Sequence, residues 1–202
     1  TTVDNSGAFS VNGIDVTSLG DGTLTLSVTL TDAAGNTSSA STTTVTKDTV
    51  NPSVNAGVDV SKRSTHTTST TVSDAAPSSG IASYLWTMTS GPGTISFVTP
   101  NAVNTDLSAD TDGTYVIRLT VTDIAGNSSF DEFSLVWDTV VPTVSAGSDI
   151  TTNNPFIQVG TVNDPTPSSG IASIVWSQVS GPGTITFGTP NSVTTTVSAN
   201  TD

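Results

Sequence analysis

Short segments in which apolar and polar residues alternate recur along most of the chain. Residues 81–89 place Tyr84, Trp86 and Met88 on one side of an extended strand, and residues 114–122 show the same alternation. Successive side chains of a β-strand point to opposite faces, so this period of two predicts strands that each bury one face.

Clusters of glycine, proline, serine and aspartate separate the alternating segments and predict turns. Many short strands at this spacing, with no helical periodicity between them, are typical of two packed sheets. The predicted fold class is therefore all-β, a β-sandwich. The strands expected in the best-defined segment are 53–56, 67–73, 81–89, 95–97, 103–107, 114–122 and 130–137.

An internal repeat sets the organisation of the chain. Residues 52–112 align without gaps with residues 142–202, and both copies contain the sequences PSSGIAS and SGPGTI. A weaker match relates residues 21–36 to residues 112–127. Self-similarity at a fixed period is the sequence signature of a tandem array of modules.

These matches predict three modules. Residues 1–50 form the back part of one module, residues 51–140 a complete module and residues 141–202 the front part of a further module. Pro52 and Pro142 lie at the boundaries, where proline fixes φ and restricts the preceding residue. The joints between modules are therefore predicted to be short and stiff.

The composition excludes several classes of function. The formal net charge is −13 and only four residues are Lys or Arg. Because proteins bind nucleic acids by neutralising phosphates with basic side chains, no nucleic-acid partner is expected. No apolar run approaches the roughly 18 residues that a membrane span requires, so no direct membrane insertion is expected. The absence of cysteine excludes disulfides and thiolate metal sites.

No catalytic constellation is recognisable, and the chain is predicted not to be an enzyme. The only histidine, His66, lies in a polar stretch expected to be a loop, and its aligned residue in the next module is Phe156. The only glutamate is Glu132, and the aspartates are scattered over turns, so no pair of acids for glycoside hydrolysis is evident.

Trp86 has two interpretations. As a residue of a central strand it packs in the core; as an exposed platform it would stack on a sugar. Its match at Trp176 favours the core, because every module needs one. Trp137 lies next to a predicted boundary and is expected to pack at the joint.

The sequence also resembles known families. Residues 84–93 (YLWTMTSGPG), followed by GTY at 113–115 and LTVTD at 119–123, resemble polycystic-kidney-disease-like (PKD-like) immunoglobulin-like domains, and residues 174–183 (IVWSQVSGPG) repeat the first part. The segments 3–9, 19–23, 31–36 and 47–49 are similar to the immunoglobulin-like repeats of large bacterial surface adhesins. The resemblance implies tandem immunoglobulin-like β-sandwich modules, an extracellular location on the bacterial cell surface, and calcium at the joints between modules.

Aspartates gather at the predicted joints, which makes Ca²⁺ the cofactor to consider. Calcium takes six to eight oxygen ligands, which carboxylates and carbonyls supply. The second interpretation is that these residues cap turns through their own backbone. The candidate metal ligands are Asp32, Asp48 and Asp59 at the first joint, and Asp123, Asp138 and Asp149 at the second.

The leading hypothesis is a structural stalk or spacer of a bacterial cell-surface adhesin or extracellular fibre. One alternative is a self-assembling filament subunit, in which strands of neighbouring chains complete the partial modules; another is a carbohydrate-binding module. Incomplete modules at both ends expose sheet edges, which attract other strands. The expected partners are therefore neighbouring immunoglobulin-like modules, either in cis or in trans, and pairing in trans gives a homopolymer.

Overall fold

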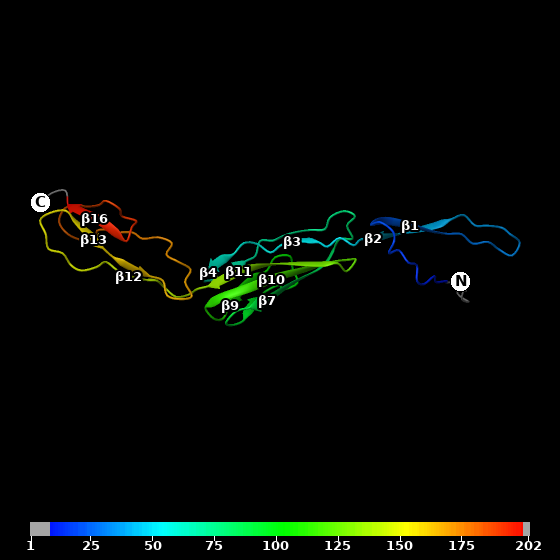
Figure 1. Cartoon of the computed structure of the whole chain (residues 1–202), viewed down its shortest axis with the longest axis horizontal. Helices are drawn as coiled ribbons and strands as arrows, with labels where there is room; N and C mark the ends of the chain where they lie inside the picture. The colour runs from blue at the N-terminus through cyan, green and yellow to red at the C-terminus, as the bar shows by residue number, and fades with distance from the viewer. Residues whose placement is uncertain (1–8, 200–202) are drawn as a thin grey trace.

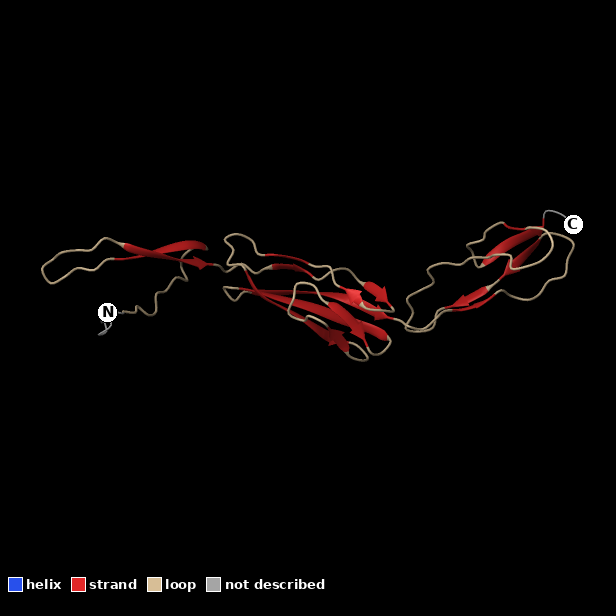
Figure 2. Cartoon of the chain, turned by 180° about the vertical axis from the view of Figure 1, so that it is seen from behind, coloured by secondary structure: helices blue, strands red, loops and turns tan. Residues whose placement is uncertain are grey.

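The computed structural model describes residues 9–199. All regular secondary structure in this range consists of β-strands (Figures 1 and 2). The predicted all-β class is confirmed. The strands are β1 (Gly22–Val28), β2 (Ser41–Lys47), β3 (Ser53–Asn55), β4 (Val60–Lys62), β5 (His66–Thr67), β6 (Thr71–Ser73), β7 (Ile81–Ser90), β8 (Ile95–Phe97), β9 (Asp106–Ala109), β10 (Gly113–Asp123), β11 (Ser128–Trp137), β12 (Thr143–Ser145), β13 (Phe156–Val159), β14 (Thr161–Asn163), β15 (Ile185–Phe187) and β16 (Thr194–Ala199). A helix capable of crossing a membrane does not occur among these residues.

The strands form three groups that follow one another along the long axis (Figure 1). The first is the antiparallel hairpin of β1 and β2. The second contains β3 to β11, and the third contains β12 to β16. Every strand pair in the described range joins strands of the same group.

The central group is a two-layer sandwich. One layer is a four-stranded sheet in the order β4-β11-β10-β7, in which β4 pairs with β11 in parallel and the other pairs are antiparallel. The other layer consists of two smaller sheets, β3-β6 and β5-β9-β8. Between the layers, the alternating side chains of β10 contribute four fully buried apolar residues: Tyr115, Ile117, Leu119 and Val121.

Both tryptophans of the central sandwich lie in this core. Trp86 is 2% exposed, packs edge-on against Phe133 and donates its indole N–H to the carbonyl oxygen of Ala102 at 3.1 Å. The core interpretation of Trp86 is confirmed. Trp137 is also buried in this core, on the same inward-facing side of β11 as Phe133 and Leu135, and it ends the strand directly before Asp138 of the second joint.

The single strand expected at 67–73 is divided into β5 and β6, which belong to different sheets. The break occurs at Thr68, which is buried and accepts a hydrogen bond from the backbone N–H of Thr105 at 2.9 Å. The chain crosses here from the edge of one sheet to the edge of the other. Because the crossing depends on a residue distant in sequence, the local pattern did not indicate it.

The third group repeats the front half of the central sandwich. The pairing of β12 with β14 corresponds to β3 with β6, and the sheet β13-β16-β15 corresponds to β5-β9-β8. Residues 171–180 align with β7, yet they pair with no strand in the described part of the chain. The apolar side of this segment therefore remains partly open.

Candidate metal centre and hydrogen-bonded joints

Two adjacent residues, Asp48 and Thr49, form hydrogen bonds on both sides of the joint between the hairpin and the central sandwich. Thr49 donates from its backbone N–H and its hydroxyl to the Asp21 carboxylate of the preceding hairpin, at 3.1 and 2.7 Å. Asp48 accepts the backbone N–H of Ser79, in the following sandwich, at 2.8 Å. We call this arrangement the Asp-Thr clamp.

The second joint contains the same clamp. Thr139 donates from its backbone N–H and its hydroxyl to Asp112 at 3.1 and 2.9 Å. Asp138 accepts the backbone N–H of Ser169 at 2.9 Å. The agreement between the two joints follows from the repeated Asp-Thr-Val sequence and indicates that each joint has a defined geometry.

The carboxylates of the clamp are stabilised in their charged form. Hydrogen bonds from Ser79, and then from the backbone N–H of Val50, hold the pKa of Asp48 below its ordinary value. A hydrogen bond from Ser169 does the same for the pKa of Asp138. Hydrogen bonds to an ionised carboxylate are stronger than those between neutral groups, so both clamps are charge-assisted at neutral pH.

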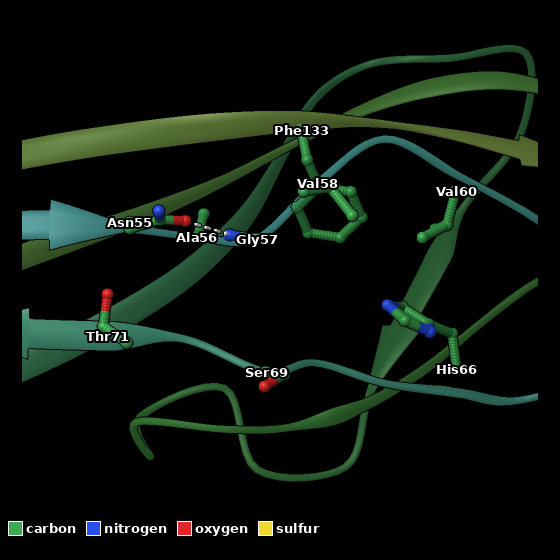
Figure 3. Close-up of a pocket in the computed structure, with 9 residues that line it drawn as sticks. All are labelled: Asn55, Ala56, Gly57, Val58, Val60, His66, Ser69, Thr71 and Phe133. Atoms are coloured by element: carbon green, nitrogen blue, oxygen red, sulfur yellow. Dashed lines mark hydrogen bonds between the residues drawn. The ribbon is translucent and has the colours of Figure 1, made fainter.

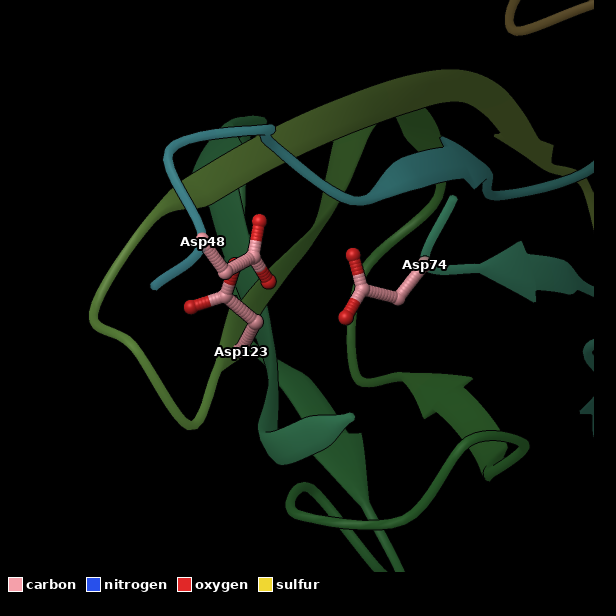
Figure 4. Close-up of side chains that lie close together, drawn as sticks. All are labelled: Asp48, Asp74 and Asp123. Carbon is pink, nitrogen blue, oxygen red and sulfur yellow. The ribbon is translucent and has the colours of Figure 1, made fainter. Parts of the chain in front are cut away.

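At the first joint, Asp48 forms part of a cluster of three carboxylates with Asp74 and Asp123 (Figure 4). One oxygen from each side chain lies within 4.8 Å of the others. Asp48 comes from the joint, Asp74 follows β6, and Asp123 ends β10. Three segments distant in sequence therefore supply one oxygen-rich site, which we call the aspartate triad.

Neighbouring residues donate hydrogen bonds to the carboxylates of the triad but leave one oxygen, Oδ1 of Asp74, without a donor. Asp123 accepts the backbone N–H and the side-chain amide of Asn127, each at 2.8 Å. One oxygen of Asp74 accepts the Ser78 hydroxyl at 2.7 Å and the Gly80 N–H at 2.9 Å. Its other oxygen, Oδ1, is buried and has no hydrogen-bond partner. A buried polar atom without a partner is costly and calls for an explanation.

A divalent cation fits this environment. Asp48 and Asp123 are both buried, and the ion pairs in residues 9–199 are Lys47–Asp21 and Arg118–Glu132, neither of which reaches the triad. Buried charges of one sign are unfavourable unless they are paired or coordinate a metal. Carboxylate oxygens are the ligands that Ca²⁺ prefers, with carbonyls or water completing its shell.

The second joint holds the corresponding pair of acids. Asp164 aligns with Asp74 and accepts the Ser168 hydroxyl and the Gly170 N–H, each at 2.7 Å. Asp138 aligns with Asp48. A third acid does not join this pair among the described residues. The second joint therefore contains counterparts of two of the three aspartates in the triad.

The structure groups the six sequence-predicted ligands differently from the sequence analysis. Asp48 and Asp123 lie together at the first joint, although Asp123 was assigned to the second. Asp138 lies at the second joint. Asp32 lies in the turn between β1 and β2, at the end of the hairpin where Val28 pairs with Ser41, whereas the joint follows Lys47 at the other end.

The remaining two predicted ligands lie apart from both joint clusters. Asp59 accepts the backbone N–H of Ser134 in β11 at 2.7 Å, close to the opposite end of the sandwich from Asp48. Asp149 is exposed in the loop after β12. The physical reason for the position of Asp59 is the direction of the chain: β3 and the segment after it carry the chain away from the first joint, towards the end of the sandwich at which β4 pairs with the last residues of β11.

Sequence reasoning missed Asp74. The signal was present in the repeat, because the sequences DAAPSSG at 74–80 and DPTPSSG at 164–170 share their aspartate and their Pro-Ser-Ser-Gly. The loop folds back on its own aspartate through Ser78 and Gly80. Proximity to Asp48 depends on the fold and was not visible from spacing.

A second candidate is an apolar hollow of about 350 Å³ beside the core of the central sandwich (Figure 3). Val58, Val60, His66 and Phe133 line it, and the His66 ring lies 5.9 Å from the Phe133 ring in an edge-on arrangement. Burial, and secondarily the nearby Lys62, lower the pKa of His66, which favours the neutral imidazole. His66 begins β5 and does not lie in a loop as expected.

The fold and the core tryptophan define the central sandwich as an immunoglobulin-like β-sandwich module. Residues 56–136 match the family model described as K319L-like, PKD domain. This segment, less than half of the chain, is similar to PKD domains, a class that is not typically enzymatic. A comparison with curated proteins gave no significant match.

Proposed function

We propose that the chain is a structural stalk or spacer segment of a bacterial cell-surface adhesin or extracellular fibre. Its modules act by holding a fixed separation and direction between the parts that they join. The observation that carries this proposal is the Asp-Thr clamp, which occurs at both joints with nearly equal distances. A spacer depends on joints of fixed direction, and the repeated clamp supplies them.

Stiffness of the joints is the first expected property. Replacing Thr49 and Thr139 together with valine removes the hydroxyl bonds to Asp21 and Asp112, each worth about 1 kcal/mol. We expect small-angle X-ray scattering to show a shorter mean maximum dimension and a broader distance distribution than for the wild-type chain. Thr44→Val, on the exposed outer face of β2, is the matched control and should scatter like wild type.

A double variant with an unchanged scattering profile would show that the clamp does not stiffen the joints, and the spacer proposal would lose its main support. Circular dichroism of each variant establishes that the sandwich itself remains folded.

Calcium at the aspartate triad is the second part of the proposal. Ca²⁺ would be held by Asp48, Asp74 and Asp123, would offset two of their three negative charges and would tie the joint to two loops of the sandwich. The unpartnered Oδ1 of Asp74 supports this assignment. A metal bound at such a joint stiffens it further, because bending the joint would pull Asp48 away from the metal and break its coordination shell.

Thermal unfolding in millimolar Ca²⁺ and in EDTA tests the metal. A ligand at about 100 times its dissociation constant stabilises by about 2.7 kcal/mol, which corresponds to about 10–20 °C for a module of this size. Asp74→Asn should abolish the shift, and in EDTA it should unfold at or above the wild-type temperature because one of three like charges is gone. Asp149→Asn, an exposed acid outside the triad, is the control and should keep the full shift.

If Ca²⁺ leaves the wild-type melting temperature unchanged, the aspartates act only as caps of turns. If Asp149→Asn removes the shift instead, the ligands are those grouped by sequence position and not those of the triad.

A further inference from the structure

His66, the one histidine of the chain, lies against the core of the central sandwich. Figure 3 shows its ring directed into the hollow that Val60 and Phe133 also line. Phe133 is 3% exposed, and its ring packs edge-on against both His66 and Trp86. His66 therefore ends a row of three aromatic rings that leads into the core, and a proton added to it places a charge at the edge of that core.

Few backbone contacts hold His66 in place. β5 consists of His66 and Thr67 alone, and it is an outer strand of the sheet β5-β9-β8. His66 pairs with Leu107, while Thr67 pairs with Asp106 and donates its hydroxyl to the Asp106 carboxylate. Segments with few hydrogen bonds and few buried contacts open at the lowest cost in free energy. The position of β5 therefore depends on the apolar contacts of the His66 ring.

A protonated His66 finds no carboxylate to pair with. Burial, followed by the positive charge of Lys62, lowers the pKa of His66, and no acid of the described chain contributes to the shift. The turn before β5 adds a second cation, Arg63. The acids on the neighbouring elements bond elsewhere: Asp59 to Ser134, Asp106 to Thr67, Asp131 to Ala56, and Glu132 to Arg118.

We propose that His66 makes the central sandwich acid-sensitive: protonation of its ring displaces β5 from the hollow and loosens the side of the sandwich formed by β4 and β5. The aligned residue in the third group is Phe156, which carries no charge at any pH. The second joint adjoins the loosened side, because Asp138 donates its backbone N–H to the Lys62 carbonyl at 2.9 Å. Acid therefore weakens the module at the end from which the next module extends.

The pH range follows from the direction of the shift. The imidazole of the unfolded chain has a pKa of about 6.5, and the pKa in the folded protein is lower. Stability is therefore complete above about pH 6.5, and it is lost as the pH falls from there towards the pKa of the folded state. Hydrogen bonds hold the pKa values of Asp48 and Asp138 below 3.8, so these carboxylates stay ionised throughout this range.

The single histidine allows a direct measurement on the whole chain. In EDTA, the imidazole C–H resonance followed by NMR should titrate with a midpoint below about 6.5. Lys62→Met removes the neighbouring positive charge, keeps the backbone carbonyl that Asp138 contacts, and should raise the midpoint. Lys47→Met, at the first joint, is the matched control and should leave the midpoint unchanged. A wild-type midpoint at or above 6.5 overturns the proposal.

Thermal unfolding in EDTA measures the consequence for stability. Between about pH 7.5 and about pH 5.5, the melting temperature of the central sandwich should fall by about 3–6 °C. His66→Phe introduces the residue of the next repeat and should remove most of this fall; His66→Gln, which is also uncharged, serves if the larger ring prevents folding. Adding Ser64→His to His66→Phe returns an imidazole to the exposed turn before β5, and should not restore the fall.

An equal fall in wild type and in the uncharged variants overturns the proposal. A fall restored by Ser64→His overturns it too, because the histidine would then act through net charge and not from the hollow. Hydrogen exchange locates the loosening: at about pH 5.5, protection should decrease in β5 and its partner β9 before β10 and β11. A uniform decrease across all strands of the sandwich would contradict the displacement of β5.

Discussion

Replacing Trp86 with alanine is expected to destabilise the central sandwich by about 3–5 kcal/mol, the range for loss of a large buried aromatic side chain. The side chain is 2% exposed, contacts Phe133, and donates its indole N–H to Ala102, so its removal leaves both a cavity and an unpaired carbonyl. For a domain of this size the melting temperature should fall by about 15–30 °C. Thermal unfolding followed by tryptophan fluorescence and circular dichroism measures the change.

Trp176→Ala is the matched control for this prediction. Trp176 makes the equivalent indole bond, to Ser192 at 2.7 Å, but its ring is only half-buried. Less apolar contact is lost, and the change in stability should be less than half as large. Equal losses from the two substitutions would contradict the interpretation that the four-stranded sheet, present around Trp86 only, creates the buried environment.

Gly91→Ala is expected to cost about 2–4 kcal/mol, from backbone strain and overpacking together. Gly91 has φ of +152°, and a Cβ atom at this position would overlap the Tyr115 ring. Tyr115 is fully buried and its hydroxyl donates to the Thr111 carbonyl at 2.6 Å, so the ring cannot retreat. Chemical denaturation of the whole chain gives the change in the free energy of unfolding.

The repeat again offers a control, because Gly181 occupies the aligned position with φ of +126°. The nearest atom to a Cβ atom there is the Gln178 amide nitrogen, at 3.6 Å. Gly181→Ala therefore meets backbone strain without a clash and should cost about 1–2 kcal/mol. If the two alanine variants were equally destabilised, contact with Tyr115 would not be the reason for glycine in the first copy.

The long strands were predictable from sequence because each buries one face. The alternation at 81–89, 114–122 and 130–137 gave β7, β10 and β11 to within two residues. The short strands were less predictable. Residues 67–73 have the composition of one strand, but the buried Thr68 and its bond from Thr105 divide them between two sheets. A change of sheet depends on contacts distant in sequence, which local composition does not record.

The same distinction applies to the candidate metal centre. The sequence indicated aspartates at the joints, and Asp48 and Asp123 do meet there. It did not indicate which aspartates share a joint, because this depends on the direction in which β10 carries the chain. Asp74 was missed for a related reason: its loop approaches Asp48 only after β6 and β7 have packed into opposite layers.

The parallel pairing of β4 with β11 has a mechanical consequence. The chain enters the central sandwich at the first joint and runs through β3 and β4 towards the second, where β11 leaves it. Tension along the long axis pulls these two strands past each other in shear, so the Val60–Leu135 and Lys62–Trp137 pairings carry the load together rather than opening one after another. The resistance of such a module to force is set by the barrier to unfolding and not by its equilibrium stability. A domain of modest thermal stability can therefore still resist a pulling force along its long axis.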